Sequence, residues 1–260
     1  MYIKPYDELT IQDNFIFQKV MRNKRICKQT IERLLDIDTK DISYPEEEKS
    51  INVRLDSKSI RLDVYVNDDK GTVFNIEMQT TKDMDELVKR TRYYQGLIDI
   101  DNIEKGQNYS ALHDTYIIFI CTFGVFTGKR HKYTFRNLCI EDNEILLNDG
   151  TTKLFLSTKG EADDVSKPLK MFLDYVDGKK PEDALMQEID HEVDTVKHCD
   201  EWRRDYMTLA LEMDKKWREG KAEGKIEAIR NAIKDGLTTL AAVKKSGRYT
   251  EEEIAAIAAP

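Results

Sequence analysis

Two short runs of alternating apolar and polar residues, joined by a polar turn, constrain the fold of this chain more than any other feature. The runs span residues 61–66 and 74–79. The turn between them, residues 67–71, is rich in Asp and ends on Gly71, which suits the left-handed position of a hairpin loop. Alternation with a period of two is typical of β-strands that present two different faces. The pattern therefore predicts a β-hairpin.

The hairpin gathers its polar side chains on one face. These are Arg61, Asp63, Tyr65, Asn75, Glu77 and Gln79. If the turn pairs Val66 with Thr72, Asp63 lies opposite Asn75 and one diagonal step from Glu77. Two carboxylates at neighbouring positions destabilise a sheet unless a cation or a bound proton offsets them. The pair therefore indicates a hard-metal site of the Mg²⁺ type, and the alternative is an ordinary solvated face of a one-sided sheet.

The same residues resemble the PD-(D/E)XK nuclease superfamily. Asp63 stands fourteen residues before Glu77-Met78-Gln79, and the flanking segments read RLDVYV and NIEMQ. The closer resemblance is to a bacterial branch of recombination-promoting nucleases and transposases. The resemblance implies that Asp63 and Glu77 bind Mg²⁺ or another divalent cation, with the backbone carbonyl of Met78 as a further ligand. Gln79 stands in place of the usual lysine, and since its amide carries no charge and is not a base, it can only orient water.

The resemblance continues on both sides of the hairpin. The segment IQDNFIFQKVMRNKR is similar to the opening helix of that family, which implies Asp13 as an additional metal ligand. The segments DELVKRTRYYQGLIDIDNIEKGQNY and TYIIFICTFGVF are similar to the helix and the buried strand that complete the core. On that helix Arg90, Arg92 and Tyr94 are candidates for contact with the DNA backbone. Arg92 and Tyr94 cannot share one helical face, and the alternative for Tyr94 is a place in the core.

The order of elements predicts an α/β fold with a restriction-endonuclease-like core of helix, three strands, helix and strand. Its central buried strand is expected at residues 116–123, and extra strands are expected near residues 132–135 and 153–156. A change from strands to helices near residue 160 predicts a nuclease-like domain at 1–160 and a helical region at 161–260. In the tail, glycines at 220 and 224 weaken the helical pattern, and Thr250 with Glu253 forms a capping-box motif. The tail resembles a helix-turn-helix, but its acidic second helix favours a packing or dimerisation role.

Composition limits the possible functions. With 260 residues, 40% of them hydrophobic, the chain can bury one sizeable core. No segment approaches the roughly 18 continuous apolar residues of a membrane helix, and the start lacks the apolar run of a signal peptide, so we expect no membrane contact and a cytoplasmic location. Four cysteines show no zinc-binding spacing. The net charge of −8 argues against broad affinity for nucleic acid, so any contact with DNA must be local.

These observations predict a metal-dependent DNA endonuclease that hydrolyses phosphodiester bonds, linked to recombination, transposition or defence against mobile elements. The alternative is a catalytically weak nuclease-fold module that binds DNA or supports assembly, and a pure protein scaffold is a third reading. By analogy with single-site nucleases that cut both strands, a homodimer is a further expectation.

Overall fold

The computed structural model describes residues 3–44, 50–51 and 60–259. The chain divides into two compact units, one formed by Asp7–Cys199 and the other by Met1–Tyr6 together with Asp200–Pro260. The expected functional division at residue 160 stays a prediction. Pro45 and the link at residues 56–59, which the sequence assigns to loops, lie outside the described residues.

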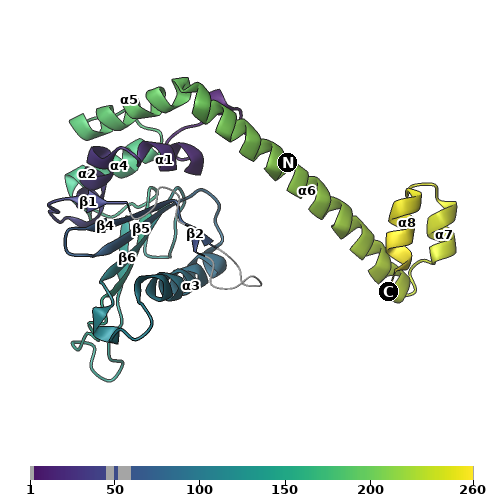
Figure 1. Ribbon diagram of the computed structural model, residues 1–260, viewed down its shortest axis with the longest axis horizontal. Coiled ribbons are helices and arrows are strands. Elements are labelled where there is room, and N and C mark those ends of the chain that lie inside the picture. Colours follow the sequence, from purple (N-terminus) through teal and green to yellow (C-terminus); the bar gives the residue numbers. More distant parts are fainter. Residues whose placement is uncertain (1–2, 45–49, 52–59, 260) are drawn as a thin grey trace. The chain divides into compact units, whose positions relative to one another are not determined.

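A six-stranded mixed sheet forms the centre of the larger unit (Figure 1). Its strands, in spatial order, are β1 (Ile42–Ser43), β4 (Val64–Asp68), β5 (Val73–Gln79), β6 (Thr115–Cys121), β8 (Thr151–Ser157) and β7 (Lys132–Phe135). β5, β6 and β8 are parallel to one another, whereas the outer pairs are antiparallel. A separate two-stranded sheet joins β2 (Ser50–Ile51) and β3 (Ile60–Arg61). The α/β class, the buried central strand and both extra strands are thereby confirmed.

Helices cover the sheet on both sides (Figure 1). On one face lies α3 (Met84–Asn102), and on the other lie α1 (Asn14–Val20), α2 (Lys24–Leu35), α4 (Lys167–Val176) and α5 (Ala184–His198). Short 3₁₀ turns occur at Tyr6–Glu8 and Tyr109–Ala111. Two of these helices begin at an aspartate whose side chain accepts a hydrogen bond from a first-turn N–H group, Asp83 for α3 and Asp183 for α5. The beginning of α3 is therefore fixed directly after β5.

The hairpin β4–β5 has a different register from the expected one. Tyr65 pairs with Asn75 and Val66 pairs with Phe74, so the expected pairing of Val66 with Thr72 is wrong by two residues. The carboxylate of Asp68 accepts the Thr72 N–H at 2.8 Å, and Gly71 adopts φ +85°, which together close a loop of only three residues. Because the shift is an even number, every side chain of the hairpin strands keeps its predicted face.

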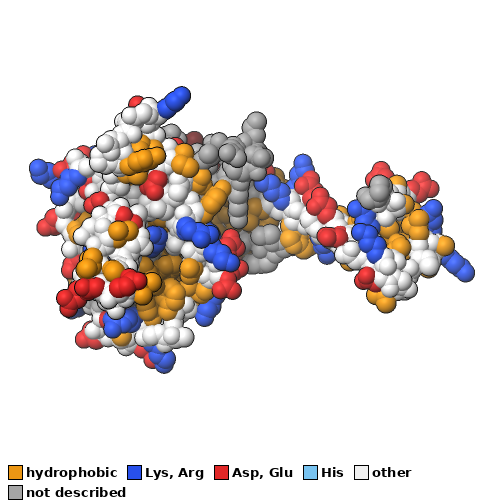
Figure 2. Space-filling model, turned by 90° about the horizontal axis from the view of Figure 1, so that it is seen from below, with side chains coloured by type: hydrophobic (Ala, Val, Ile, Leu, Met, Phe, Trp, Pro, Cys, Tyr) orange, Lys and Arg blue, Asp and Glu red, His pale blue; other side chains and the backbone are white. Residues whose placement is uncertain are grey.

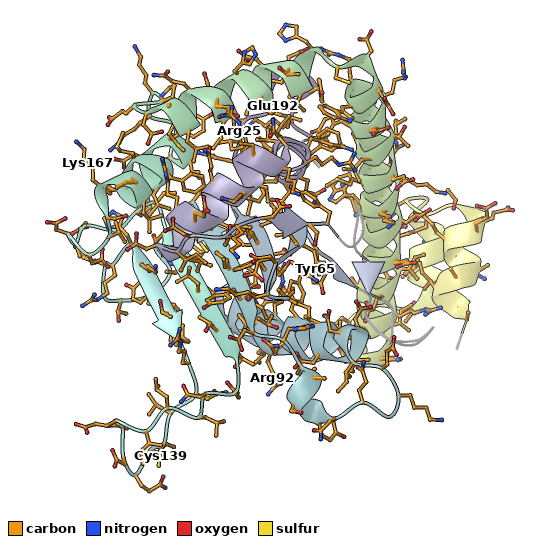
Figure 3. All side chains as sticks on the ribbon, turned by 60° about the vertical axis from the view of Figure 1, so that its left-hand side comes forward. Arg25, Tyr65, Arg92, Cys139, Lys167 and Glu192 are labelled. Carbon is orange, nitrogen blue, oxygen red and sulfur yellow. The ribbon has the colours of Figure 1, made fainter. Side chains whose placement is uncertain are left out.

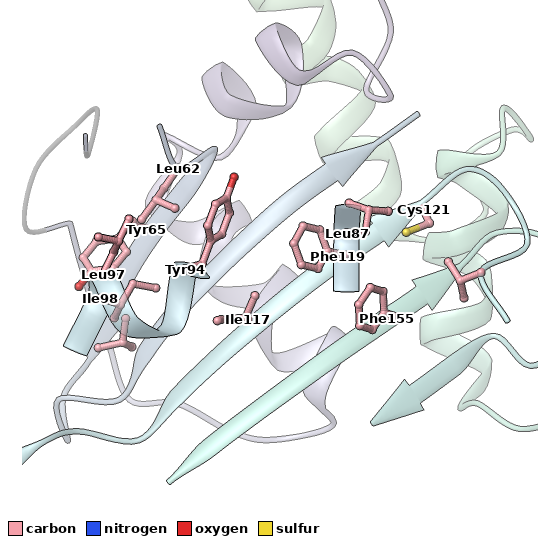
Figure 4. Close-up of a cluster of buried hydrophobic side chains, with 12 residues drawn as sticks. Leu62, Tyr65, Leu87, Tyr94, Leu97, Ile98, Ile117, Phe119, Cys121 and Phe155 are labelled. Atoms are coloured by element: carbon pink, nitrogen blue, oxygen red, sulfur yellow. The ribbon is translucent and has the colours of Figure 1, made fainter. Parts of the chain in front are cut away.

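The polar face of the hairpin is covered at Tyr65, Asn75 and Glu77, so the solvated-face alternative is wrong there. Figure 4 shows the cluster that lies between α3 and the sheet, with Tyr65, Tyr94 and Phe119 among its members. Phe119 stacks on Phe155 with ring centroids 5.4 Å apart. Beneath the same helix Asn75 is fully buried and Glu77 is 2% exposed. The packing of α3 therefore places polar groups of β5 inside the molecule.

The smaller unit consists mainly of helices α6 (Asp200–Lys234), α7 (Leu240–Lys245) and α8 (Glu251–Ala258). α6 continues through Gly220 and Gly224, the two glycines that weaken the helical pattern of the sequence, because strong helix formers surround both of them. The capping box of Thr250 and Glu253 is confirmed. In the described part of the chain, no helix combines the length and the apolar character that crossing a bilayer requires.

Candidate active site

A bend in the main chain at Asp63 brings two carboxylates together. β4 begins only at Val64, and the register of the hairpin, continued by one residue, puts Asp63 directly opposite Glu77. The Met78 N–H donates to Asp63 Oδ2 at 3.2 Å, and the Asp63 N–H donates to Glu77 Oε1 at 3.2 Å. Each carboxylate thus accepts a hydrogen bond from a backbone N–H group of the segment that carries the other acid. These two bonds hold both carboxylates at the same end of the hairpin.

Glu77 is a buried acid in an unfavourable electrostatic position. Burial, together with the nearby Asp63 charge, raises the pKa of the Glu77 carboxyl well above its ordinary value of 4.5. Partial compensation comes from Arg90, whose Nη2 lies 3.4 Å from Glu77 Oε2. The Asn75 amide nitrogen lies 3.3 Å from Glu77 Oε1 in the orientation that satisfies both ends of the amide. The carboxylate is therefore held in place while its charge is only partly offset.

Helix α3 supplies the cation next to the two acids. Arg90 donates to Gln79 Oε1 at 3.1 Å and to the Tyr94 hydroxyl at 2.7 Å. Its guanidinium also lies over the rings of Tyr94 and Phe119, with its carbon 5.2 and 5.5 Å from their centroids. Burial raises the pKa of Tyr94 to about 12, so this phenol stays protonated at neutral pH. Tyr94 therefore belongs both to the core and to the site, as the residue that fixes Arg90.

Arg92, two residues further along α3, lies on the exposed side of the helix (Figure 3). The expectation that Arg92 and Tyr94 occupy different helical faces is confirmed, since Tyr94 is 6% exposed. Two lysines elsewhere in the larger unit pair with acids other than Asp63 and Glu77. Lys24 contacts Asp41 at 2.7 Å and Lys129 contacts Glu161 at 2.8 Å. Of the two arginines expected to contact DNA, Arg90 is therefore the one that lies beside the acids.

Helix α1 reaches the site through Gln18, which the sequence reasoning missed. Gln18 Nε2 donates to Asp63 Oδ1 at 2.8 Å, while Met78 occupies the other oxygen of this carboxylate. Asp13 lies at the N-cap of α1, where its carboxylate accepts the Thr10 N–H at 2.7 Å. The sequence offers a weak signal for Gln18, because this amide stands in the segment assigned to the opening helix. A metal-ligand role for Asp13 stays a prediction.

The oxygen donors at this position fit a hard divalent cation. In the described ranges, no group of three or more His, Cys, Asp or Glu side chains is placed to hold a metal. Two carboxylates are nevertheless enough for Mg²⁺, which keeps several waters and completes its shell with substrate oxygens. The Met78 carbonyl adds a third oxygen: in a β-strand the N–H and C=O of one residue point to the same side, and the Met78 N–H points at Asp63. The residues therefore suit a Mg²⁺ ion that is completed by water and phosphate.

The chain matches a known family over the segment that carries this site. The model of the PD-(D/E)XK nuclease family transposase matches residues 14–158. This segment is more than half of the 260 residues, and it runs from the first residue of α1 to just beyond β8. It contains Asp63, Glu77, Gln79 and Arg90 but begins one residue after Asp13. Neither the curated proteins nor the solved structures provide a match.

Proposed function

This chain belongs to the PD-(D/E)XK nuclease family transposases, and from this premise we propose that it is a Mg²⁺-dependent DNA endonuclease that hydrolyses phosphodiester bonds. The family itself supports a nuclease or transposase-related role. One observation supports the more specific proposal of metal-dependent DNA cleavage. The carboxylates of Asp63 and Glu77 each accept a backbone hydrogen bond from the segment that carries the other, and so they converge at the bend. We assign the activity to recombination, transposition or defence against mobile elements. The cytoplasmic location stays a prediction.

The carboxylates of Asp63 and Glu77, with the Met78 carbonyl, are the proposed ligands of the ion. A bound Mg²⁺ would polarise the phosphoryl group and lower the pKa of a coordinated water. Gln18 and the Met78 N–H fix the orientation of the Asp63 carboxylate by donating to its two oxygens. This support matters because both acids must present their free lone pairs to one point.

Gln79 has a restricted role in this proposal. Its Oε1 accepts from Arg90, so the amide nitrogen is the end that remains to donate to a water or a phosphate oxygen. An amide cannot remove a proton, and Gln79 therefore orients the attacking water without acting as the base. Arg90 places a positive charge beside the acids, where a phosphate of the DNA backbone would approach. Tyr94 holds that guanidinium by hydrogen bond and ring contact.

A catalytically weak DNA-binding or assembly module is the second candidate, and one observation favours it. Arg90 donates to both Glu77 and Gln79, so a protein cation already engages two of the three proposed catalytic side chains. An incoming metal ion has to compete with this contact for Glu77. If the contact persists when DNA binds, the protein keeps the fold and the DNA affinity but loses most of the hydrolytic power.

Nicking of supercoiled plasmid in the presence of Mg²⁺ tests the endonuclease proposal. Asp63→Ala and Glu77→Ala should each reduce nicking by about 100-fold or more, and excess EDTA should abolish it. Asp69→Ala is the matched control, because this acid lies exposed in the hairpin turn and should leave the rate unchanged. Equal nicking by wild type and both site variants would assign the activity to another site or to a contaminant.

An inactive wild type across several divalent ions would shift the proposal to the second candidate. Calorimetric titration with Mg²⁺ and a gel shift with duplex DNA then separate the remaining possibilities. DNA binding without metal binding would support the binding module, whereas binding of neither would leave a protein scaffold.

A further inference from the structure

A two-stranded arm extends the edge of the sheet beyond β7. The Leu147 N–H donates to the Asn137 carbonyl and the Cys139 N–H donates to the Ile145 carbonyl, each at 2.9 Å. A bridge between Leu138 and Leu146 continues this pairing. Figure 3 shows the segment around Cys139 projecting away from the sheet. We call residues 136–147 the arm.

The arm and the last residue of β7 expose an unusual amount of apolar surface. Six large hydrophobic side chains in this short segment are between 40% and 85% exposed: Phe135, Leu138, Ile140, Ile145, Leu146 and Leu147. Single exposed apolar residues are normal on proteins, but six within one short segment indicate a surface that another molecule covers. Figure 2 shows hydrophobic side chains gathered on one face of the larger unit.

No strand among the described residues pairs with the outer edge of this segment, which leaves it as a template for a further strand. β7 is the last strand of the sheet, and its odd-numbered residues bond to β8, beginning with the Ser157 N–H on the His131 carbonyl. In the arm, Asn137 and Cys139 likewise bond to the returning strand. Because backbone groups alternate along an antiparallel ladder, those of Thr134, Arg136 and Leu138 point outward. A continuous edge therefore runs from β7 into the arm.

Charge is unevenly distributed along this edge. The tip of the arm carries Glu141, Asp142 and Glu144, and none of these acids forms an ion pair with a Lys or Arg among the described residues. At the base, Arg136 has only the Thr152 hydroxyl as a side-chain partner within the described ranges, at 3.3 Å. When two identical edges run antiparallel, the tip of one lies beside the base of the other. The acidic tip of one copy is therefore complementary in charge to the base of the second copy, which carries Arg136.

We propose that this edge and arm form the interface of a homodimer, in which the outward-facing residues Thr134, Arg136 and Leu138 pair antiparallel with the arm of a second copy about a two-fold axis near Leu138. The pairing satisfies the outward backbone groups, brings the exposed apolar side chains of the two arms side by side and places the acidic tip next to the partner's Arg136. The interface lies on a different part of the sheet from the two acids, so it holds whether or not the protein cleaves DNA.

Sedimentation velocity between about 1 and 100 μM tests the interface on the full chain. Wild type should be a dimer at the upper concentrations, and Thr134→Pro should be monomeric throughout. Proline is tolerated here because the Thr134 N–H points away from β8, but it removes a donor and obstructs the incoming strand. Thr134→Ala is the matched control and should dimerise as wild type does. Circular dichroism melts establish that each variant is folded.

A monomeric wild type at 100 μM would overturn the proposal, and so would a dimer that Thr134→Pro leaves intact. The second outcome would assign dimerisation to another surface, such as the helices of the smaller unit. Leu138→Glu provides an independent variant if the proline variant fails to fold, and it should also give a monomer.

Charge exchange tests the antiparallel orientation. Arg136→Glu and Glu144→Arg should each weaken self-association by about 10-fold, since each places like charges across the interface. An equimolar mixture of the two variants should restore dimerisation, because the reversed base of one then meets the reversed tip of the other. Failure of the mixture to associate better than either variant alone would reject the antiparallel arrangement.

Discussion

The end of β5 and the arm depart from the usual arrangement of polar and apolar residues in opposite ways. At the end of β5 a carboxyl group, Glu77, is almost completely buried beneath α3. On the arm, aliphatic side chains such as Ile140 are largely exposed, at 85%. A buried polar group and an exposed apolar cluster are the informative exceptions in a folded protein. In the two proposals made above, each region takes a partner of a different kind: a metal ion at the end of β5 and a second copy of the chain at the arm.

The two exceptions differ in how the fold supports them. Glu77 accepts from the Asp63 N–H and contacts Arg90, and the helix above it is anchored in a large hydrophobic cluster. The rest of the core therefore offsets the cost of burying this acid. The arm has a single bridge and a few backbone hydrogen bonds, so little of the folding energy depends on it. A disturbance at β5 should consequently change chemistry and stability together, whereas a disturbance of the arm should change only association.

Metal binding should show the largest difference between the two regions. Asp63→Asn keeps the shape and an acceptor for the Met78 N–H but removes the charge, so Mg²⁺ affinity should fall by about 100-fold or more. Leu138→Ser on the arm should leave the affinity unchanged within error. Isothermal titration calorimetry measures both. Equal affinities of wild type and Asp63→Asn would show that the two acids do not form the metal site.

Removal of the cation at the site should have a smaller effect. Arg90→Ala frees Gln79 from its fixed orientation and takes away the charge beside Glu77, so plasmid nicking should fall by about 10-fold to 100-fold. Lys89→Ala is the matched control on the same helix and should change the rate by less than about twofold, since Lys89 is exposed and is not one of the proposed contacts. A faster Arg90→Ala variant would instead indicate that Arg90 competes with the metal ion for Glu77.

The sequence predicted those parts of the fold that depend on local patterns. Alternation and turn chemistry identified the hairpin, and Gly71 has the predicted left-handed conformation. The register was missed because it depends on the Asp68 side chain, whose carboxylate accepts the Lys70 and Thr72 N–H groups and shortens the loop. A side chain that bonds to its own turn leaves no mark on the apolar pattern.

The parts of the site that come from distant segments were harder to predict. Burial of Glu77 results from the packing of α3, and the alternating pattern of β5 is the same for a covered and for a solvated face. Gln18 reaches Asp63 from a helix forty-five residues earlier in the chain, and its contact depends on how α1 packs on the sheet. The exposed residues of the arm were also unforeseen, since Leu138 and Ile140 alone do not distinguish a buried strand from a free one.

The stability of the metal-free protein should depend on pH through Glu77. The folded state raises the pKa of this acid well above 4.5, so between 4.5 and the raised value the folded state binds more protons than the unfolded chain. The free energy of unfolding therefore falls as pH rises through this range. Glu77→Gln removes the titrating group and should flatten this part of the profile. Urea unfolding in EDTA from pH 5 to pH 8 measures the slopes, and parallel profiles of the two proteins would contradict the assignment.

The smallest effect is expected on the arm when the protein is dilute. Ile140→Ser should change the free energy of unfolding by less than about 0.5 kcal/mol at 1 μM, because the side chain is already in water. By contrast, Ile118→Ala in the buried central strand should cost about 2–5 kcal/mol. If the arm pairs with a second copy, the difference between wild type and Ile140→Ser should grow as the concentration approaches 100 μM, since association stabilises only the folded dimer. A large effect at 1 μM would place Ile140 in an intramolecular contact and remove the contrast between the two regions.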